Sequence, residues 1–300
     1  MTTGELVLRR PSARRRPTRL RAILDLPLIP LFVLVSVVVM AALAPVIAPH
    51  SPTTQSLIDR LTPPAWAEGG STKHLLGTDH LGRDVLSRLI YGARVAVAVA
   101  GLTIAGAALI GTFAGLVAGY FGSWVDALLM RIVDIQLALP ALLFGVLLAA
   151  TFGTGLKNVI LIITVWSWAG FARVIRSEVL SLREREFVAL ARVAGMPWWW
   201  ILWKHLLPNV FNTVLVLMTL DVAVVIVFEA SLSFLGLGVV PPTPAWGSML
   251  AEGRNYLTVA WWLITLPGAA IFAVCLSSNL FGDWLRDKLD PRLRQSASGR

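Results

Sequence analysis

The feature that most constrains this chain is a series of long stretches without a charged residue. Residues 26–49 form one such stretch and residues 95–125 form another. The hydrocarbon core of a bilayer is about 30 Å thick, so a helix of about 20 apolar residues crosses it. A signal peptide is the alternative for the first stretch, because its Ala-Ala-Leu-Ala resembles a cleavage site, but signal peptides have apolar regions of only about 7–15 residues. We therefore predict membrane-spanning helices.

Six spans are expected, and together they define an all-α membrane protein without a soluble domain. Only 14% of the 300 residues are charged and 56% are hydrophobic, whereas soluble proteins carry about 25% charged residues. The predicted spans are residues 26–49, 95–125, 135–156, 158–172, 209–235 and 259–281. The predicted segments are a basic arm (1–25), the first span (26–49), an external segment (50–94), a core of five helices (95–282) that includes a cytoplasmic loop (174–208), and a tail (283–300). A single cysteine, Cys275, excludes an internal disulfide.

The distribution of basic residues predicts which side of the membrane each segment occupies. Seven arginines precede the first span: Arg9, Arg10, Arg14, Arg15, Arg16, Arg19 and Arg21. Basic residues concentrate on the cytoplasmic side of membrane proteins, so both termini and the 174–208 loop are predicted to be cytoplasmic. The net charge of +9 could also indicate a nucleic-acid-binding arm, but no soluble domain follows it. We expect a multi-pass protein of the bacterial cytoplasmic membrane that contacts lipid and no nucleic acid.

The loop between the fourth and fifth predicted spans contains the sequence REREFVALARVAGMPWWWILWKHLLP. A helix over 185–194 is predicted to have one apolar face and one basic face at about 100° per residue. The apolar face would hold Phe187, Leu190, Ala191 and Ala194, and the basic face would hold Arg185 and Arg192. Gly195 is expected to end this helix, Pro197 to open a second short helix, and Pro208 to open the fifth span.

Two interpretations fit this loop. It could be an amphipathic helix that rests on lipid headgroups, with its tryptophans as anchors. It could instead be a projecting helix that docks in a groove of a partner protein. The narrow apolar face and the forced turn at Gly195 favour the second interpretation.

Polar residues of the external segment raise the question of a metal site. His74, Asp79 and His80 carry suitable ligand atoms, but their spacing does not place them together on a helix. The alternative is turn chemistry, with Asp79 as the cap of a helix that starts near Leu81. We predict no metal site in this chain. Downstream residues Arg83, Asp84 and Arg88 could pair on a helix and help to form an external platform, or they could be solvated surface charges.

Two carboxylates, Asp221 and Glu229, fall within the fifth predicted span. A carboxylate in hydrocarbon is costly, so such residues usually face a bundle interior or a wet cavity. Eight residues along a helix correspond to about 80° of rotation, so both side chains can point to one side. We predict that they line a translocation pathway, where Asp221 would meet a partner subunit or the ammonium group of a substrate. Glu229 could equally be an interfacial or packing residue.

No recognisable catalytic motif is present, so we predict that the chain is not an enzyme. A P-loop requires Gly-Lys-Ser/Thr, and none of the lysines, at positions 73, 157, 204 and 288, follows a glycine. HExxH and GxSxG motifs are also absent. We expect no cofactor to be bound by this chain, and any ATP hydrolysis must occur on another subunit.

The spacing from Ala189 to Pro208 resembles the cytoplasmic EAA loop of ABC importer permeases. Ala191, Gly195, Leu207 and Pro208 match that pattern, which places Arg192 inside the matched helix. The chain departs from it at Ala189, where the family carries a glutamate, and Glu186 lies one turn away. The resemblance implies a type I ABC importer permease fold in which this loop is the coupling helix that docks on an ATPase subunit.

Three further stretches resemble the peptide and nickel permeases of the DppC/OppC type. They are LLGTDHLGRDVLSRLIYGAR (75–94), SLREREFVALARVAG (181–195) and EASLSFLGLGVVPPTPAWGSML (229–250). The external family motif comprises Gly77, Thr78, Asp79, Gly82, Arg83 and Asp84.

The resemblance implies an ATP-driven peptide importer with several subunits. This chain would pair with a B-type permease, two ABC ATPase subunits that bind ATP and Mg²⁺, and an extracytoplasmic peptide-binding protein. A nickel importer of the same family and a self-sufficient secondary transporter are the alternatives.

Overall fold

The computed structural model describes residues 27–289, and this part of the chain is helical without a β-strand. The elements are α2 (Leu28–Ile47), α3 (Val85–Phe121), α4 (Ser123–Ala138), α5 (Ala141–Phe152), α6 (Leu156–Leu182), α7 (Glu186–Val193), α8 (Trp198–Ile201), a π-helix η1 (Leu202–Leu206), α9 (Leu207–Phe234), α10 (Trp246–Gly253), a 3₁₀ helix η2 (Arg254–Tyr256) and α11 (Trp262–Leu289). The predicted all-α fold is confirmed. The basic arm (1–25) and the end of the predicted tail (290–300) lie outside the described residues.

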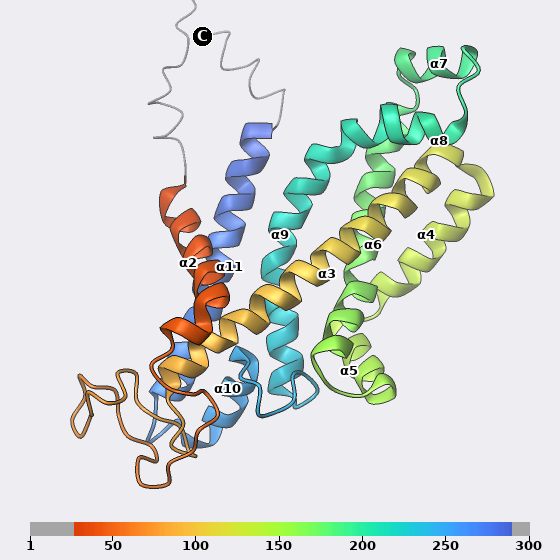
Figure 1. Cartoon of the computed structure of the whole chain (residues 1–300). Helices are drawn as coiled ribbons and strands as arrows, with labels where there is room; N and C mark the ends of the chain where they lie inside the picture. The colour runs from red at the N-terminus through yellow and green to blue at the C-terminus, as the bar shows by residue number, and fades with distance from the viewer. Residues whose placement is uncertain (1–26, 290–300) are drawn as a thin grey trace, which may run out of the picture.

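The described residues provide five helices that could cross a membrane, or six spans if the bent pair of α4 and α5 counts as one. The five that are long and apolar enough to span a bilayer are α2, α3, α6, α9 with the helical turns before it, and α11. Helices α4 and α5 meet at an angle of 95°. Figure 1 shows α3 running diagonally across the bundle. Its 37 residues correspond to a length of about 55 Å at 1.5 Å per residue. This is longer than the hydrocarbon core of a bilayer, which is about 30 Å thick, and a steep tilt accommodates the difference.

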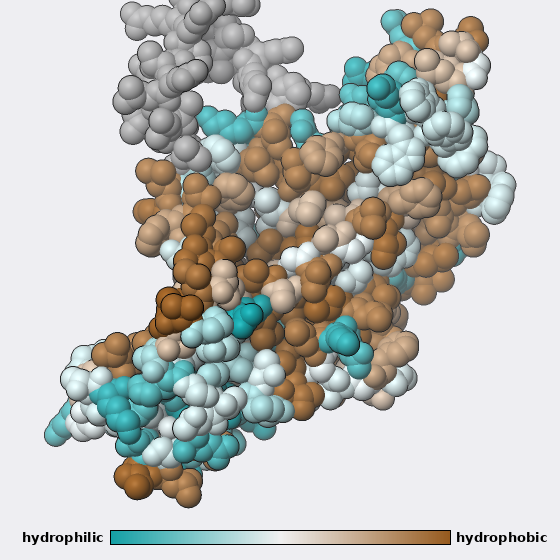
Figure 2. Space-filling model, in the orientation of Figure 1, coloured by the Kyte–Doolittle hydropathy of each residue, from teal (hydrophilic) through white to brown (hydrophobic). Residues whose placement is uncertain are grey.

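The two ends of the bundle differ in character. Figure 1 places α7, the start of α2 and the end of α11 at one end, and the loops 48–84 and 235–261 with α10 at the other. Figure 2 shows a largely hydrophobic surface between these ends and a mostly hydrophilic surface over the 48–84 loop. The described parts of the segments predicted to be cytoplasmic therefore share one side, and the segments predicted to be external share the opposite side.

Helix α3 begins at Val85, within the predicted external segment 50–94. The reason is the capping residue. The Asp84 carboxylate accepts a hydrogen bond of 2.8 Å from the Ser87 amide, which satisfies a free N–H of the first turn. Asp79 was predicted to cap a helix near Leu81, and this is wrong. Its carboxylate instead accepts from the amides of Leu81 (2.8 Å) and Arg83 (3.0 Å) in a non-helical turn.

The third and fourth spans also differ from the prediction. The third was expected to start at Ile135, but helix begins at Ser123 and is broken where Pro140 precedes α5. Proline disfavours helical geometry at the preceding residue and has no N–H to donate, and Leu139 is extended here. The fourth was expected to end near Arg173, yet α6 continues to Leu182. Arg173 pairs with Asp134 of α4, and Arg176 pairs with Asp126 at 2.5 Å, so neither arginine has to leave the helix.

Helices α3 and α6 pack with their backbones in close approach. Gly111, Gly115 and Gly119 of α3 recur every four residues and so lie on one face. A Cβ added to Gly111 would lie 2.4 Å from the Trp168 carbonyl oxygen, and one on Gly115 would lie 2.8 Å from the Ala172 carbonyl oxygen. Small residues at this spacing allow membrane helices to approach closely. This glycine seam makes α3 and α6 the central pair of the bundle.

Candidate functional site

Helix α7 is a short element held between two defined ends. Arg185 is its N-cap residue and Ala194 its C-cap residue. The Gly195 amide donates to the Arg192 carbonyl at 3.0 Å and the Met196 amide to the Ala191 carbonyl at 3.1 Å. This pair of bonds is the Schellman motif, which needs a left-handed residue, and Gly195 has φ of 73°. The predicted stop at Gly195 therefore occurs, and it turns the chain back toward the bundle.

The buried face of α7 differs from the predicted apolar face. Val188 and Ala191 are buried, whereas Leu190 is 68% exposed and Val193 is 87% exposed. Of the predicted apolar face, only Ala191 is buried within this chain, and Phe187, Leu190 and Ala194 are exposed. The helix lies on its neighbours through the side that contains Val188, so its tip presents apolar side chains outward. Glu186 and Ala189 are both exposed and lie three residues apart on this helix.

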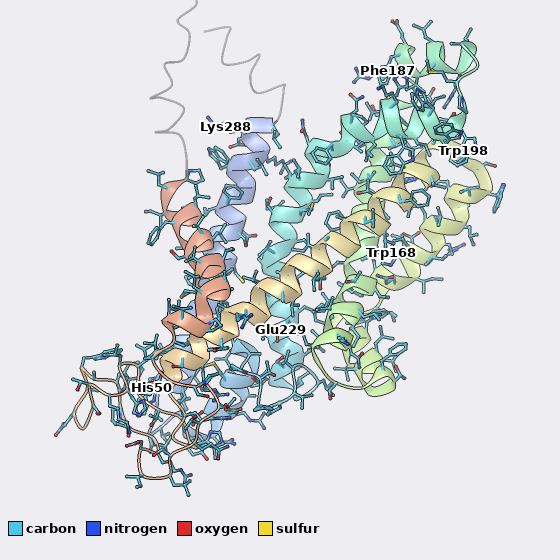
Figure 3. All side chains as sticks on the ribbon, viewed as in Figure 1. His50, Trp168, Phe187, Trp198, Glu229 and Lys288 are labelled. Atoms are coloured by element: carbon cyan, nitrogen blue, oxygen red, sulfur yellow. The ribbon has the colours of Figure 1, made fainter. Side chains whose placement is uncertain are left out.

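Two contacts attach α7 to the rest of the bundle. The Arg192 guanidinium lies 5.0 Å from the centroid of the Tyr120 ring at the end of α3, which is a cation–π geometry. Phe187 lies beside His205 of η1, with ring centroids 6.2 Å apart. Figure 3 shows Phe187 at the junction between α7 and the helical turns below it. Helix α7 thus contacts both the end of α3 and the helical turns that lead into α9.

The chain from Trp198 to Phe234 is one continuous helical rod. Pro208 lies in the first turn of α9, as predicted for a residue that opens the fifth span. The turns α8 and η1 nevertheless run directly into α9, so this opening is not a break. Pro208 has no N–H to bond the carbonyl four residues earlier, and the turn just before it widens into the π-helix Leu202–Leu206. The Asn209 side chain donates to the His205 carbonyl at 2.6 Å, which satisfies a group in this turn. Leu207 and Pro208 therefore lie inside the rod that carries the loop into the membrane.

Four tryptophans gather on α8 and η1, and all are exposed: Trp198, Trp199, Trp200 and Trp203. Trp198 packs edge-on against Phe121 with ring centroids 5.4 Å apart, and Figure 3 shows it at the end of α3. Exposed tryptophans are typical of the boundary between lipid and water. They mark the depth at which the rod enters the membrane, with α7 beyond it.

A buried network of ion pairs holds the external segment. The Asp79 carboxylate accepts from Arg83 Nε at 2.6 Å and also from Arg88, and Glu252 of α10 accepts from both arginines at 2.6 and 2.7 Å. Burial raises the pKa of Asp79, but Arg88, Arg83 and the two backbone amides outweigh it and hold that pKa below its usual range. Burial lowers the pKa of neighbouring His80, so no third positive charge opposes the arginines at neutral pH.

This network differs from both alternatives that were considered for Arg83, Asp84 and Arg88, which were pairing along a helix and solvated surface charge. Arg83, Asp84 and Arg88 neither pair along a helix nor lie in solvent, because all three are buried and both arginines bind Asp79 and Glu252. All six residues of the external family motif are buried. Gly82 has φ of 72°, and a Cβ there would lie 1.8 Å from the Ser56 carbonyl oxygen. The motif therefore fixes the segment internally instead of presenting a surface.

The external segment is also fastened to the last span. Thr78 is fully buried, and its carbonyl accepts a hydrogen bond of 3.1 Å from Trp262 Nε1 of α11. The considered trio His74, Asp79 and His80 does not assemble. His80 and Asp79 group with Glu252, whereas His74 groups with His50 and Asp84. Sequence reasoning missed Glu252, because a residue 164 positions from Arg88 leaves no local signal.

The two carboxylates of the fifth span have different surroundings. Glu229 is 3% exposed and accepts a 2.6 Å hydrogen bond from Ser233 Oγ one turn on. Figure 3 shows it in the part of α9 nearer the external loops. Asp221 faces Ser167 of α6. Neither Asp221 Oδ2 nor Ser167 Oγ has a hydrogen-bond partner of ordinary geometry among the described residues. Asp221 is thus the carboxylate with unused hydrogen-bonding capacity.

Open grooves border the α9 rod, and two of them differ in character. One, of about 490 Å³, is lined by apolar side chains that include Trp166, Phe228 and Cys275, together with Asn279. The other, of about 380 Å³, lies near the α7 end and is polar, with Glu178, Asn209, Asn212, Thr213 and Arg286 in its wall. Asp221 and Glu229 line neither groove. The polar groove was not predicted, because its residues come from three helices and form no motif.

The chain belongs to the binding-protein-dependent transport system inner membrane components. Residues 111–295 match that family, so the protein is a multi-pass transport permease of the inner membrane, and its relatives extend the match over the external segment. The chain is 44% identical over 261 residues to the dipeptide transport system permease protein DppC of Escherichia coli (strain K12), covering 87% of each chain. It is 43% identical over 261 residues to the di/tripeptide transport system permease protein DppC of Pseudomonas aeruginosa (strain UCBPP-PA14), covering 87% of this chain and 86% of the relative. It is 40% identical over 268 residues to the dipeptide transport system permease protein DppC of Haemophilus influenzae (strain Rd), covering 89% and 91% respectively. A permease of this kind works with a separate binding protein and ATPase subunits.

Proposed function

We propose that this chain is the C-type permease of an ATP-driven importer of di- or oligopeptides. The observation that carries the proposal is α7, whose apolar tip, Leu190 and Val193, is exposed on a helix fixed to α3 and to the α9 rod. An apolar helix face of this kind suits a groove on a partner protein. The peptide cargo is supported by the relatives, whose names specify dipeptide and di/tripeptide transport.

The proposed assembly contains this chain, a B-type permease, two ABC ATPase subunits and an external peptide-binding protein. ATP and Mg²⁺ belong to the ATPase subunits; this chain binds neither of them and catalyses no reaction. The α7 end is the cytoplasmic side and the loops 48–84 and 235–261 face outward, so both termini are cytoplasmic. Exposed apolar residues in the external segment, Leu57 and Ile58, provide a surface for the binding protein.

The proposed mechanism uses α7 as a lever. Closure of the ATPase subunits displaces α7, and Gly195 and the π-turn before Pro208 pass that displacement to the α9 rod. The residues that make the coupling contacts are Glu186, Ala189, Ala191, Arg192, Gly195, Leu207 and Pro208. Glu186 takes the role of the glutamate that the family carries at the position of Ala189. Asp221 lies along the translocation pathway, where its free carboxylate oxygen meets a peptide ammonium or a polar group of the partner permease. Glu229 contributes through the same helix.

Transport by the whole assembly tests this proposal. The chain is purified with the subunits encoded beside it and reconstituted in proteoliposomes, and uptake of a labelled dipeptide is followed with and without ATP and binding protein. Uptake should require ATP, the ATPase subunits and the binding protein. Uptake in ATP-free vesicles by this chain alone would instead establish a secondary transporter. Uptake of Ni²⁺ and not of dipeptide would identify the cargo as nickel.

A further inference from the structure

A second cluster of ligand-bearing side chains lies outside the ion-pair network of the external segment. His50 follows the end of α2, His74 lies in the external loop, and Asp84 caps α3. One ligand atom from each lies within 4.8 Å of the others. Figure 3 shows His50 where α2 leads into the external loops. Three segments that are separate in sequence therefore bring two imidazoles and one carboxylate to one point.

The distances in this cluster are close to those of a coordination sphere. Asp84 Oδ1 lies 2.9 Å from His74 Nδ1 and 3.8 Å from His50 Nδ1. Zinc binds histidine nitrogen at about 2.0–2.1 Å, so neighbouring ligand atoms of a tetrahedral site are about 3.4 Å apart. The two observed distances bracket this value, and shifts of a few tenths of an ångström would accommodate an ion.

Two ring nitrogens in this cluster have no hydrogen-bond partner within the described part of the chain, and their rings line a cavity. His50 Nδ1 and His74 Nε2 are buried and have no hydrogen-bond partner among the described residues. The His74 side chain is only 6% exposed. Both rings border an open cavity of about 210 Å³ that also contains Asp59 and Lys73. A buried polar atom without a partner is costly, and coordination of a cation would satisfy the His50 nitrogen at this cavity.

The surrounding bonds orient the ligands in the way that metal sites require. Asp84 Oδ2 accepts from the Ser87 amide at 2.8 Å and from Ser87 Oγ at 2.7 Å. Asp84 Oδ1 is hydrogen-bonded to His74 Nδ1 at 2.9 Å, and coordination of both atoms to one ion would replace this bond. The Ser87 hydroxyl also accepts from the His50 amide at 3.0 Å. Such outer contacts hold coordinating side chains in position. Ser87 therefore links two of the three ligands.

We propose that His50, His74 and Asp84 bind a divalent transition-metal ion, with zinc as the best match, and so cross-link the end of α2 to the start of α3. Two imidazole nitrogens favour zinc and its first-row neighbours over magnesium or calcium. Three protein ligands leave a fourth position toward the cavity. The other group, Asp79 with His80 and Glu252, does not qualify, because Arg83 and Arg88 occupy its carboxylates. This inference departs from the sequence-based expectation that the chain has no metal site.

Binding of Zn²⁺ and Co²⁺ to the full-length chain in nanodiscs, without an affinity tag, tests the proposal. We expect a single saturable Zn²⁺ per chain by calorimetry, and a visible Co²⁺ spectrum typical of tetrahedral coordination. His50→Gln should weaken Zn²⁺ binding at least tenfold and remove the Co²⁺ bands. His50 is half-buried and its ring donates no hydrogen bond to the protein, so this variant should fold normally. The control is His80→Gln in the same external segment, which should leave binding unchanged.

A thiolate variant gives a direct readout of the ligand. His50→Cys retains a coordinating atom, so Zn²⁺ binding should persist and Co²⁺ should show a sulfur-to-metal charge-transfer band that the wild-type chain lacks. The proposal is overturned if the wild-type chain binds no Zn²⁺ saturably. It is also overturned if His50→Gln binds as the wild type does, or if His80→Gln, and not His50→Gln, abolishes binding.

Discussion

The buried ion-pair network predicts a large effect of removing one negative charge from the external segment. The change is Asp79→Asn, which keeps the shape of the side chain and loses its charge. Asp79 is 2% exposed and binds both Arg83 and Arg88. Loss of one partner from a buried ion pair typically costs about 3–5 kcal/mol, because the remaining charge is buried without compensation. Glu252 still binds both arginines, so we expect the lower part of this range, about 3 kcal/mol.

Hydrogen exchange of the reconstituted protein measures this effect locally. A loss of about 3 kcal/mol corresponds to about 100-fold faster exchange, since each 1.4 kcal/mol is a factor of ten. The affected amides are those of Leu81, Arg83 and the first turn of α3, which exchange by opening of this segment. The control is Glu68→Gln, which removes an exposed carboxylate of the same segment and should change exchange little. Equal protection in Asp79→Asn and the wild type would refute the reasoning.

The same network predicts the pH dependence of this difference. The pKa of folded Asp79 is depressed, whereas that of an unfolded aspartate is about 3.9. The stabilisation is therefore fully present above the unfolded pKa and is lost as pH falls through the folded pKa. Wild type and Asp79→Asn should differ at neutral pH and converge only in strong acid. Convergence near pH 6 would assign the effect to another group.

Three further variants test the α7 lever and the pathway. Leu190→Asp should leave the stability of the isolated chain within about 0.5 kcal/mol, as for other surface substitutions, yet abolish co-purification of the ATPase subunits; normal co-purification would exclude α7 as the docking element. Gly195→Ala should cost about 1–2 kcal/mol in local stability, because alanine disfavours the left-handed backbone conformation of this residue. No steric clash adds to this cost, since no atom lies within 4 Å of the added Cβ. Hydrogen exchange at the Met196 amide measures the effect, and unchanged exchange contradicts it. Asp221→Asn should reduce dipeptide uptake without reducing ATPase binding, and uptake equal to the wild type would remove Asp221 from the pathway.

The sequence predicted the helices well where the signal was continuous. The first span and the turn at Gly195 followed from a charge-free run and from one glycine before a proline. The ends of the helices in the middle of the chain were not predicted, because charged residues were taken as the ends of spans. Arg173 and Arg176 remain in α6, since their partners Asp134 and Asp126 lie on the adjacent helix.

The candidate site shows a similar limit. The positions of the external motif were found from the sequence, but their burial could not be, because the charge of Arg88 is neutralised by distant Glu252. The apolar face of α7 was predicted from the spacing of its own apolar residues. Its actual orientation depends on what it packs against, and the residues left exposed, such as Leu190, are the apolar ones available to another subunit. Sequence alone does not separate a face buried within the chain from one buried by a partner.

The glycine seam between α3 and α6 has a mechanical consequence. Where one backbone touches another, sliding or rotation of either helix brings carbonyl oxygens into collision, so this pair tilts only as a single body. The 48–84 loop, fastened to the start of α3, and helix α7, which contacts the far end of α3 through Arg192 and Tyr120, are thereby attached to the same stiff beam. A push received at one membrane surface is transmitted to the other, and the flexing must occur where the remaining helices meet that beam.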